Sequence, residues 1–391
     1  MAKPKIRFKG YQDDWEQRKL GEVFRERIER AAGDEELLSV TIANGVIRQA
    51  DSEKRNIASE DKKNYKMVYQ GDVPYNSMRM WQGAVGNSEY CGIVSPAYTV
   101  LIPTQEANGK FFMELFKKEN SLKIFQRLSQ GLTSDTWNLK YPVLSTIEFH
   151  IPKINEQNKI ATYFSTLDHL ITLHQRKCDE AKKLKKFMLQ KMFPQNGSLV
   201  PKIRFSGFTD DWEQRKLGEV FRERIERAAG DEELLSVTIA NGVIRQADSE
   251  KRNIASEDKK NYKMVYQGDV PYNSMRMWQG AVGNSEYCGI VSPAYTVLIP
   301  TQEANGKFFM ELFKKENSLK IFQRLSQGLT SDTWNLKYPV LSTIEFHIPK
   351  INEQNKIATY FSTLDHLITL HQQKCDDLKN LKKYMLQNMF V

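Results

Sequence analysis

Two short segments of this sequence collect the side-chain types that recognise the edges of nucleic-acid bases. An arginine can fork its hydrogen bonds onto guanine, and a glutamine or asparagine can do so onto adenine. The glycine-flanked segment 76–87 offers such groups, together with a tryptophan that could wall a groove; the alternative is a core Trp81 beside a solvated Arg79. The candidates in this segment are Asn76, Ser77, Arg79, Trp81 and Gln82.

The second segment, residues 130–140, opens with a glycine and carries small hydrogen-bonding side chains. Its candidates are Thr133, Ser134, Asn138 and Lys140; the alternative is a loop that only caps a following strand. A third group, Arg48 with Lys54 and Arg55, follows an Asn-Gly turn, and ordinary surface charge explains it equally well.

Motifs for catalysis do not accompany these residues. The N/D-P-P-Y/F motif of amino-group methyltransferases is missing, as are glycine-rich phosphate loops and the HExxH and DxDxDG metal patterns. The four cysteines lie far apart without a CxxC pair, which predicts reduced thiols. His174 and His371 are interpreted as core or interface histidines. The sequence therefore predicts no catalytic site and no metal site.

The charge balance favours a polyanionic partner. Lysine and arginine number 57 against 48 acidic residues, a net charge of +9, which suits DNA, RNA or an anionic membrane surface. The start of the chain lacks the apolar core of a signal peptide, and no run of 18 apolar residues is present. We therefore expect neither a secretory signal nor a membrane span.

The most informative feature is an internal repeat with an offset of 197 residues. Residues 4–194 align with 201–391 without a gap, and 13–175 equal 210–372 letter for letter. Identical surfaces in one chain should recognise identical features of a partner, so a two-fold arrangement predicts a two-fold symmetric partner. The second copy of the candidate set is Arg245, Asn273, Ser274, Arg276, Trp278, Gln279, Thr330, Ser331, Asn335 and Lys337.

Ten aligned positions differ, and seven of them lie near the end of the repeat. Three of these replace a basic residue of the first copy by a neutral one: Arg176/Gln373, Lys183/Asn380 and Lys191/Asn388. Drift on solvated faces explains them, and asymmetric contact with DNA phosphates or a partner is the alternative. Ala181/Leu378 falls on an apolar stripe, where a small-to-large pair across a helix interface would aid packing.

Each repeat is predicted to begin with a mixed α/β domain. We expect a short amphipathic helix over residues 15–29 and strands within 37–47, 66–78 and 97–103, with a hairpin turn at Asn44-Gly45. A helix over 110–128 and a strand over 145–151 complete the domain.

A long helix over about 156–193, with Asn155 as N-cap, is predicted to follow. Its apolar residues recur at alternating steps of four and three, a heptad stripe broken at Lys185. Such a helix cannot bury its stripe alone, and the short linker after it favours antiparallel pairing with its own repeat, giving a pseudo-two-fold dumbbell with two readers on a rigid spacer. The expected interface residues are Ile160, Phe164, Leu167, Ile171, Ile357, Phe361, Leu364 and Ile368.

These features predict five regions. They are a recognition domain at 1–152, a spacer helix at 153–194, a linker at 195–204, a second recognition domain at 205–349 and a second spacer helix at 350–391.

The long-helix segment, IPKINEQNKIATYFSTLDHLITLHQRKCDEAKKLKKFMLQKMF, resembles the conserved region of specificity subunits of type I restriction-modification systems. The opening WEQRKLGEV does so as well, and the segments GDVPYNSMRMWQGAVG and GIVSPAYTVL are similar to the family's target recognition domains. The resemblance covers nearly the whole chain in the family's domain order.

The resemblance implies a DNA-binding subunit without catalysis, with one recognition domain on each half-site of a split sequence and helices that set the gap. It also implies two methyltransferase subunits, which bind S-adenosylmethionine, and motor/nuclease subunits that use ATP and Mg²⁺, all in the prokaryotic cytoplasm at the nucleoid. The family's two recognition domains usually differ, whereas these are identical. We therefore predict an interrupted palindrome as the target.

Two other functions stay open on the sequence. One is a freestanding DNA-binding regulator that uses the same two domains. The other is a scaffold whose helices hold partner proteins and whose contact with DNA is incidental.

Overall fold

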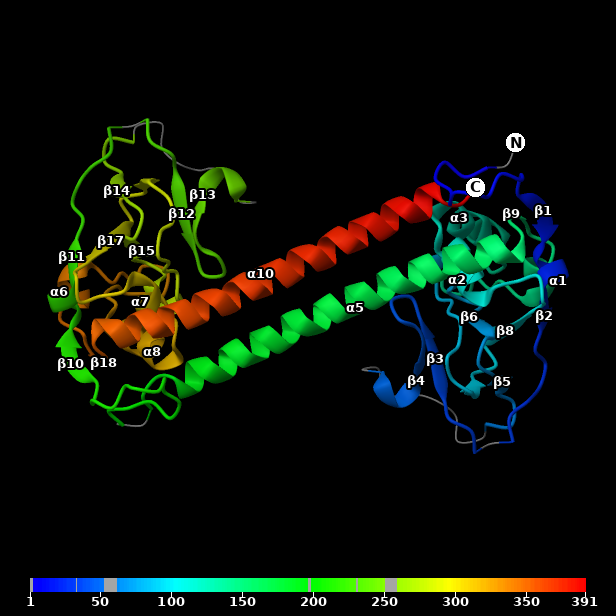
Figure 1. The fold of residues 1–391 in the computed structure, drawn as a ribbon, viewed down its shortest axis with the longest axis horizontal. Coiled ribbons are helices and arrows are strands. Elements are labelled where there is room, and N and C mark those ends of the chain that lie inside the picture. Colours follow the sequence, from blue (N-terminus) through cyan, green and yellow to red (C-terminus); the bar gives the residue numbers. More distant parts are fainter. Residues whose placement is uncertain (1–2, 33, 53–61, 196–197, 230, 250–258) are drawn as a thin grey trace. The chain divides into compact units, whose positions relative to one another are not determined.

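The computed structural model describes residues 3–32, 34–52, 62–195, 198–229, 231–249 and 259–391 (Figure 1). The chain divides into two compact units. Unit 1 comprises Met1–Gln175 and Gln372–Val391, and unit 2 comprises Arg176–His371. Each unit therefore contains one recognition domain, the first part of one long helix and the last part of the other.

The two repeats form the same series of elements. In the first they are β1 (Glu16–Lys19), α1 (Leu20–Val23), β2 (Phe24–Glu26), β3 (Leu38–Thr41), β4 (Gly45–Arg48), η1 (Gln49–Asp51), β5 (Lys66–Val68), β6 (Val73–Asn76), η2 (Met80–Gln82), β7 (Gly92–Val94), β8 (Tyr98–Pro103), α2 (Gly109–Lys117), α3 (Glu119–Leu128), α4 (Tyr141–Leu144), β9 (Glu148–Ile151) and α5 (Ile154–Lys191). In the second they are β10 (Glu213–Lys216), α6 (Leu217–Val220), β11 (Phe221–Glu223), β12 (Leu235–Thr238), β13 (Gly242–Arg245), η3 (Gln246–Asp248), β14 (Lys263–Val265), β15 (Val270–Asn273), η4 (Met277–Gln279), β16 (Gly289–Val291), β17 (Tyr295–Pro300), α7 (Gly306–Phe313), α8 (Glu316–Leu325), α9 (Tyr338–Leu341), β18 (Glu345–Ile348) and α10 (Ile351–Asn388).

The centre of each domain is a three-stranded antiparallel sheet, ordered β2-β8-β6 in unit 1 and β11-β17-β15 in unit 2. In unit 1, α2 packs its aromatic face on this sheet, and the rings of Phe24 and Phe112 meet edge to face at 4.8 Å. Asn108 caps α2 by accepting a hydrogen bond from the Phe111 amide at 3.0 Å. The predicted mixed α/β fold is confirmed, and so is the hairpin, in which Thr41 pairs with Gly45.

Three predicted elements are corrected. Residues 15–29 are not one helix: β1 pairs with β9 and β2 pairs with β8, and only α1 between them is helical. Strand pairing fixes this backbone, and Gly21 packs so closely on Ser145 that a Cβ atom would lie 3.0 Å from that residue's Cβ. The helix predicted over 110–128 is two helices, because Lys118 between them has extended backbone.

The third correction concerns the start of the long helix. Helix α5 begins at Ile154, so Asn155 lies within its first turn and is not the N-cap. The predicted helix is otherwise confirmed, and both long helices contain 38 residues.

The long helices pair in antiparallel fashion within each unit, as predicted. In unit 1, Phe164 contacts Phe390, Lys382 binds Asp168, and the Cys375 thiol lies 3.9 Å from the Ile171 carbonyl oxygen. The residue numbers rise along one helix as they fall along the other. Unit 2 repeats the pattern with Lys185 on Asp365 and the Cys178 thiol facing the Ile368 carbonyl.

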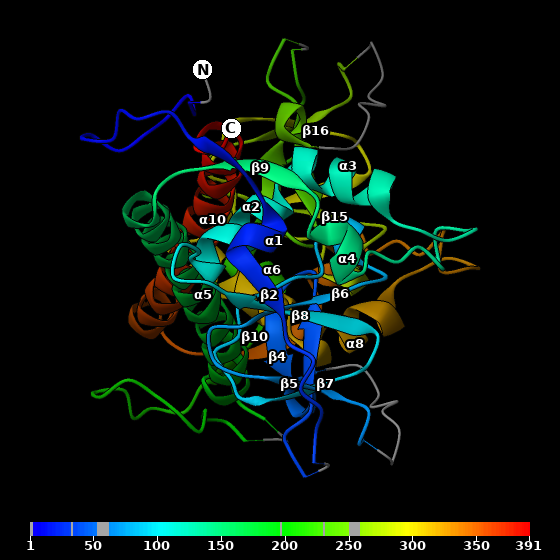
Figure 2. The same ribbon diagram turned by 90° about the vertical axis from the view of Figure 1, so that its right-hand side faces the viewer.

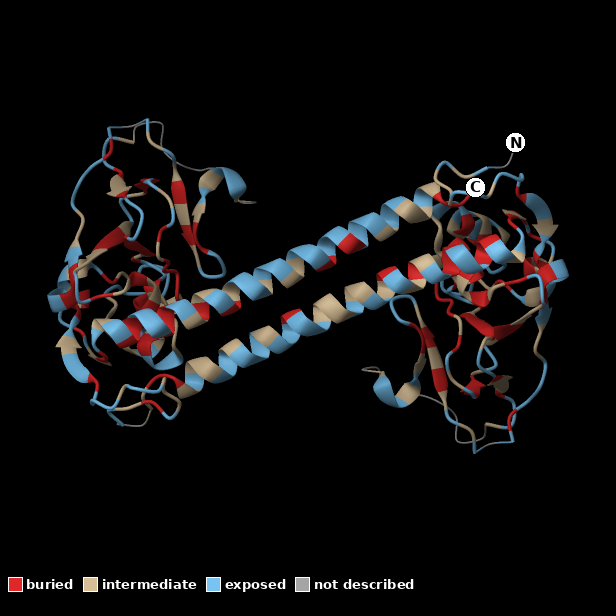
Figure 3. Cartoon of the chain, viewed as in Figure 1, coloured by how far each residue is buried: buried red, intermediate tan, exposed pale blue. Residues whose placement is uncertain are grey.

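The predicted helix-interface residues have different depths. Buried are Ile160, Phe164, Leu167, Ile357, Phe361 and Leu364. Ile171, which packs against the core of unit 1, and Ile368 are both half-buried. Figure 3 shows the buried residues concentrated where the helices meet the domains, with mostly exposed and half-buried faces between.

The differing pair Ala181/Leu378 does not form a small-to-large contact. Leu378 is buried in the core of unit 1, whereas Ala181 belongs to unit 2. The two long helices are antiparallel, in the register that places Lys382 on Asp168. Leu378 and Ala181 therefore each pack against the first half of the opposite helix, and they do not face each other.

Leu378→Ala should lower the free energy of unfolding by about 2–3 kcal/mol, because it removes buried methyl groups and leaves a cavity. Leu381→Ala is the matched control on the same helix: Leu381 is 40% exposed and should cost less than about 1 kcal/mol. Urea denaturation measures both losses. Equal losses would show that Leu378 does not carry the packing described.

Candidate nucleic-acid interface

The segment 76–87 is a loop closed on itself at the end of β6. The Asn76 amide donates to the Ala84 carbonyl at 2.9 Å, and Tyr75 pairs with Val85. Gly83 turns the chain with φ 85°, a conformation that favours glycine. The loop therefore projects from the central sheet with a defined backbone.

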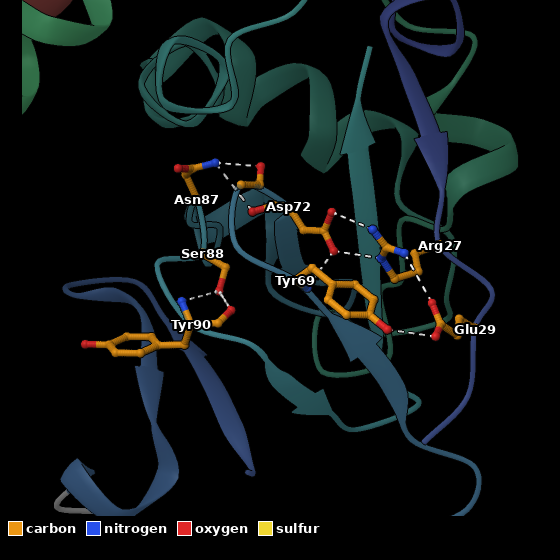
Figure 4. Close-up of polar contacts among 8 residues, drawn as sticks. Arg27, Glu29, Tyr69, Asp72, Asn87, Ser88 and Tyr90 are labelled. Carbon is orange, nitrogen blue, oxygen red and sulfur yellow. Dashed lines mark hydrogen bonds and ion pairs between the residues drawn. The ribbon is translucent and has the colours of Figure 1, made fainter. Parts of the chain in front are cut away.

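A polar cluster holds the base of this loop (Figure 4). The buried Asp72 carboxylate accepts two hydrogen bonds from the Arg27 guanidinium, at 2.7 and 3.0 Å, and one from the Tyr69 amide at 2.8 Å. Asn87, at the far end of the loop, donates to the Gly71 carbonyl at 2.8 Å. Hydrogen bonding to Asp72 raises the pKa of Arg27, so the guanidinium stays charged. Arg27 and Asp72 lie 45 residues apart in the chain, so no local sequence pattern predicts this cluster.

The side chains at the loop tip lie at the surface. Arg79 is exposed and donates to the Gln82 side chain at 3.1 Å, which places the two candidate base-reading groups side by side. Trp81 is half-buried against the core and donates its indole N–H to the Met78 carbonyl at 3.1 Å. Trp81 therefore packs inward on the core and still borders the surface, and its contact with a nucleic acid stays a prediction.

The second candidate segment meets the first. The Leu139 amide donates to the Ser77 carbonyl at 2.9 Å, and the Tyr75 hydroxyl donates to the Leu139 carbonyl at 3.0 Å. The rings of Trp81 and Trp137 contact edge to face at 5.3 Å. We call the joint surface of residues 78–82 and 130–140 the paired-loop surface.

The predicted residues take different places on this surface. Thr133, Ser134 and Lys140 are exposed. Asn76 turns its side chain to the Met78 amide, and Asn138 is half-buried, with its side-chain oxygen buried and unpaired. Ser77 is only 3% exposed and its hydroxyl bonds Thr99, so burial keeps it from any ligand.

The third group is placed elsewhere. Arg48 is half exposed, lies 3.4 Å from a Glu36 carboxylate oxygen and stacks over the Tyr90 ring. Neither partner belongs to the paired-loop surface. Lys54 and Arg55 lie outside the described residues.

Unit 2 carries the same surface with the same geometry. Arg276 donates to Gln279 at 3.1 Å, the Trp278 and Trp334 rings lie 5.2 Å apart, and the Tyr272 hydroxyl donates to the Leu336 carbonyl at 3.0 Å. Thr330, Ser331 and Lys337 are exposed, and Ser274 is buried. The Asn273 side chain accepts from the Met275 amide, and the Asn335 side-chain oxygen is buried and unpaired, as in unit 1. Arg245 pairs with Glu233.

The described residues hold no group of histidine, cysteine and acidic side chains that could bind a metal ion, and His174 and His371 are half-buried. Of the free cysteines, Cys91 and Cys288 are exposed, and Cys178 and Cys375 are buried. An open pocket of about 530 Å³ in unit 2 is lined partly by apolar residues such as Ile299 and Pro300 and partly by the ion pair of Arg224 with Asp269. Among the residues that the structure describes, no helix is long and apolar enough to cross a membrane.

The fold and the paired-loop surfaces define a class of protein: two copies of one polar recognition domain, each followed by a long spacer helix. Residues 12–183 and 209–380 each match the family described as "Type I restriction modification DNA specificity domain". The chain belongs to this family, and it is a specificity subunit, the non-catalytic component that gives such a system its DNA sequence recognition.

Individual relatives agree with this assignment. The specificity subunit of the type I restriction enzyme MjaVIII from Methanocaldococcus jannaschii is 22% identical over 337 residues, covering 78% of this chain and 76% of that protein. The crystal structure of a type I restriction-modification S subunit from M. genitalium matches with a TM-score of 0.63 at 15% identity, covering 100% of this chain and 99% of that one. At that identity the match supports the shared fold.

Proposed function

We propose that this specificity subunit reads an interrupted palindrome, with one paired-loop surface on each half-site. The observation that carries the proposal is the identity of the two surfaces, in sequence from 13–175 to 210–372 and in geometry through the Arg–Gln and Trp–Trp contacts. Two identical readers prefer the same bases. A split site with unrelated half-sites would leave one of them mismatched.

Arg79 and Gln82 are the proposed base readers in unit 1, because they are the guanine- and adenine-reading types placed side by side at the loop tip. Thr133, Ser134 and Lys140 are exposed on the second segment of the same surface and are proposed to bind phosphate and to position the loop. Asn76, Ser77 and Asn138 are proposed to stabilise the loop from its inner side without touching DNA. Arg48 is proposed as a peripheral phosphate contact.

The long helices are proposed to dock two methyltransferase subunits. Leu184 and Phe187 on α5 are 44% and 48% exposed, three residues apart, and so lie on one helix face. Their counterparts on α10, Leu381 and Tyr384, are 40% and 56% exposed. One such apolar pair in each unit suits two copies of one partner.

The partners would supply the chemistry. The methyltransferases would bind S-adenosylmethionine, and restriction/motor subunits joined through them would use ATP and Mg²⁺. The proposed place of action is the prokaryotic cytoplasm, at the nucleoid.

Leu184→Glu together with Leu381→Glu should reduce co-purification of the methyltransferase at least tenfold, because each places a charge in the docking face. Lys182→Gln with Lys379→Gln is the matched control: it changes the net charge equally, at exposed positions about 200° around each helix. Quantitative pull-down of the co-expressed proteins measures the effect. Equal recovery from both double variants would place docking elsewhere.

The co-expressed proteins, tested for both DNA binding and methyltransferase recovery, also distinguish the proposed function from a freestanding regulator and from a scaffold. A chain that selects a DNA sequence but recovers no methyltransferase would be a freestanding regulator. A chain that recovers partners but binds random DNA as tightly as any selected sequence, at every salt concentration, would be a scaffold.

A further inference from the structure

The loop between α3 and α4 carries one apolar side chain fully in solvent. Leu132 is 101% exposed, and so is its counterpart Leu329. The next most exposed large apolar residues of the described chain, Ile28 and Ile225, are 78% exposed. Such exposure is unfavourable in water and occurs at the same position in both units.

The loop is built to hold this leucine outward. Gln130 and Asn138 exchange backbone hydrogen bonds at 3.0 and 2.8 Å, which closes the base of the loop. A turn follows, in which the Thr136 hydroxyl donates to the Thr133 carbonyl at 2.9 Å and the Trp137 amide donates to the same carbonyl at 3.1 Å. Figure 2 shows the segment extending away from α3 and α4.

The loop that carries Leu132 is flanked by exposed cations and rests on a pair of tryptophans. Trp137 at the base of the loop contacts Trp81 edge to face, on the surface that carries Arg79. Lys140 and Arg127, at the two ends of the segment, are exposed, and Asp135 is its one acidic residue. An apolar tip between cations fits a duplex, whose phosphates attract the cations and whose stacked bases accept the tip.

We propose that Leu132 and Leu329 are apolar wedges that enter between adjacent base pairs, one at each half-site, and partly unstack them. This inference rests on the proposed function, since it requires each unit to bind duplex DNA. The wedge adds recognition through deformability: a half-site whose wedged step unstacks easily, such as a pyrimidine–purine step, is preferred without a hydrogen bond to its bases.

The experiment uses the full chain in complex with its methyltransferase and DNA bearing the mapped target. The bend is measured by fluorescence energy transfer between the DNA ends, and unstacking by 2-aminopurine placed in turn at each step of a half-site. The wild type should bend the site and brighten 2-aminopurine at one step. Leu132→Ala with Leu329→Ala should remove the brightening, reduce the bend and weaken binding about tenfold.

DNA with an abasic site at the wedged step supplies the decisive comparison, since its stack is already broken. The double variant should recover most of its lost affinity on this DNA. Ile28→Ala with Ile225→Ala is the matched control for losing exposed apolar surface, and should behave as wild type on both DNAs.

The outcomes distinguish the wedge from the proposed function. Wild-type protein without sequence preference would overturn both. Sequence-selective wild type with an unchanged bend and 2-aminopurine signal in the leucine double variant would overturn the wedge alone. Loss of methyltransferase recovery in that variant, with DNA bending unchanged, would also overturn it by making Leu132 a protein contact.

Discussion

Lys382→Met should destabilise unit 1 by about 3–5 kcal/mol, because it leaves a buried carboxylate without its counter-charge. Lys382 on α10 donates to the Glu114 carboxylate at 2.9 Å and to Asp168 at 2.7 and 2.8 Å. Glu114 on α2 is 1% exposed, and its second carboxylate oxygen has no hydrogen-bond partner in the described chain. The lysine thus joins a recognition domain to both long helices.

The loss should depend on pH in a predictable direction. Burial raises the pKa of Glu114 above its ordinary 4.5, although Lys382 opposes the shift. A raised carboxyl pKa favours folding below pH 4.5, and that contribution disappears as the pH rises through the folded-state value. Without Lys382 the pKa of Glu114 rises further. The variant's deficit should therefore be full at neutral pH and shrink in acid, where Glu114 is protonated.

Two further variants test the cause. Lys185→Met should lower the stability of unit 2 with the same pH dependence, because Lys185 donates to the buried Glu311 at 2.9 Å. Adding Glu114→Leu to Lys382→Met should recover most of the stability, because an apolar pair replaces the orphaned charge. Denaturation curves at pH 5 and pH 7.5 measure each change. An undiminished deficit in acid, or no recovery in the double variant, would contradict this explanation.

Arg79→Ala together with Arg276→Ala should weaken specific DNA binding by roughly 30-fold to 10⁴-fold. Each forked contact to a base discriminates by about 1–3 kcal/mol, and the two units contribute independently. Each single variant should show half of the total free-energy loss. Fluorescence anisotropy on the cognate duplex measures the affinities.

Lys140→Ala with Lys337→Ala is the comparison, since these exposed lysines are proposed phosphate contacts. It should weaken cognate and random DNA alike and lower the salt dependence of binding, whereas the arginine variant should lose preference among half-site sequences. If the arginine variant also weakened both DNAs alike, Arg79 would be a phosphate contact and no base reader.

The sequence predicted the long helices and their antiparallel pairing, because periodicity and the repeat both act over long stretches. Lys185, which breaks the apolar stripe, is half-buried and paired with Glu311. That partner could not be predicted, since it lies on another element 126 residues away. The helix predicted over residues 15–29 was wrong for a related reason. The spacing of the apolar residues is typical of a helix, but pairing with β8 and β9 determines the backbone.

The candidate site was predicted as two separate segments, and the structure joined them through Leu139 and the two tryptophans. Residue type alone could not show that Ser77 is buried or that Leu132 is fully exposed, because both depend on how the loops pack. The Arg27–Asp72 pair that supports the first loop gave no local signal in the sequence.

The palindromic target is the central claim, and methylome sequencing of cells carrying this chain with its methyltransferase tests it most directly. Identical recognition domains predict one methylated motif whose two half-sites are the same sequence on opposite strands, separated by a gap of fixed length. Two unrelated half-sites would contradict the claim.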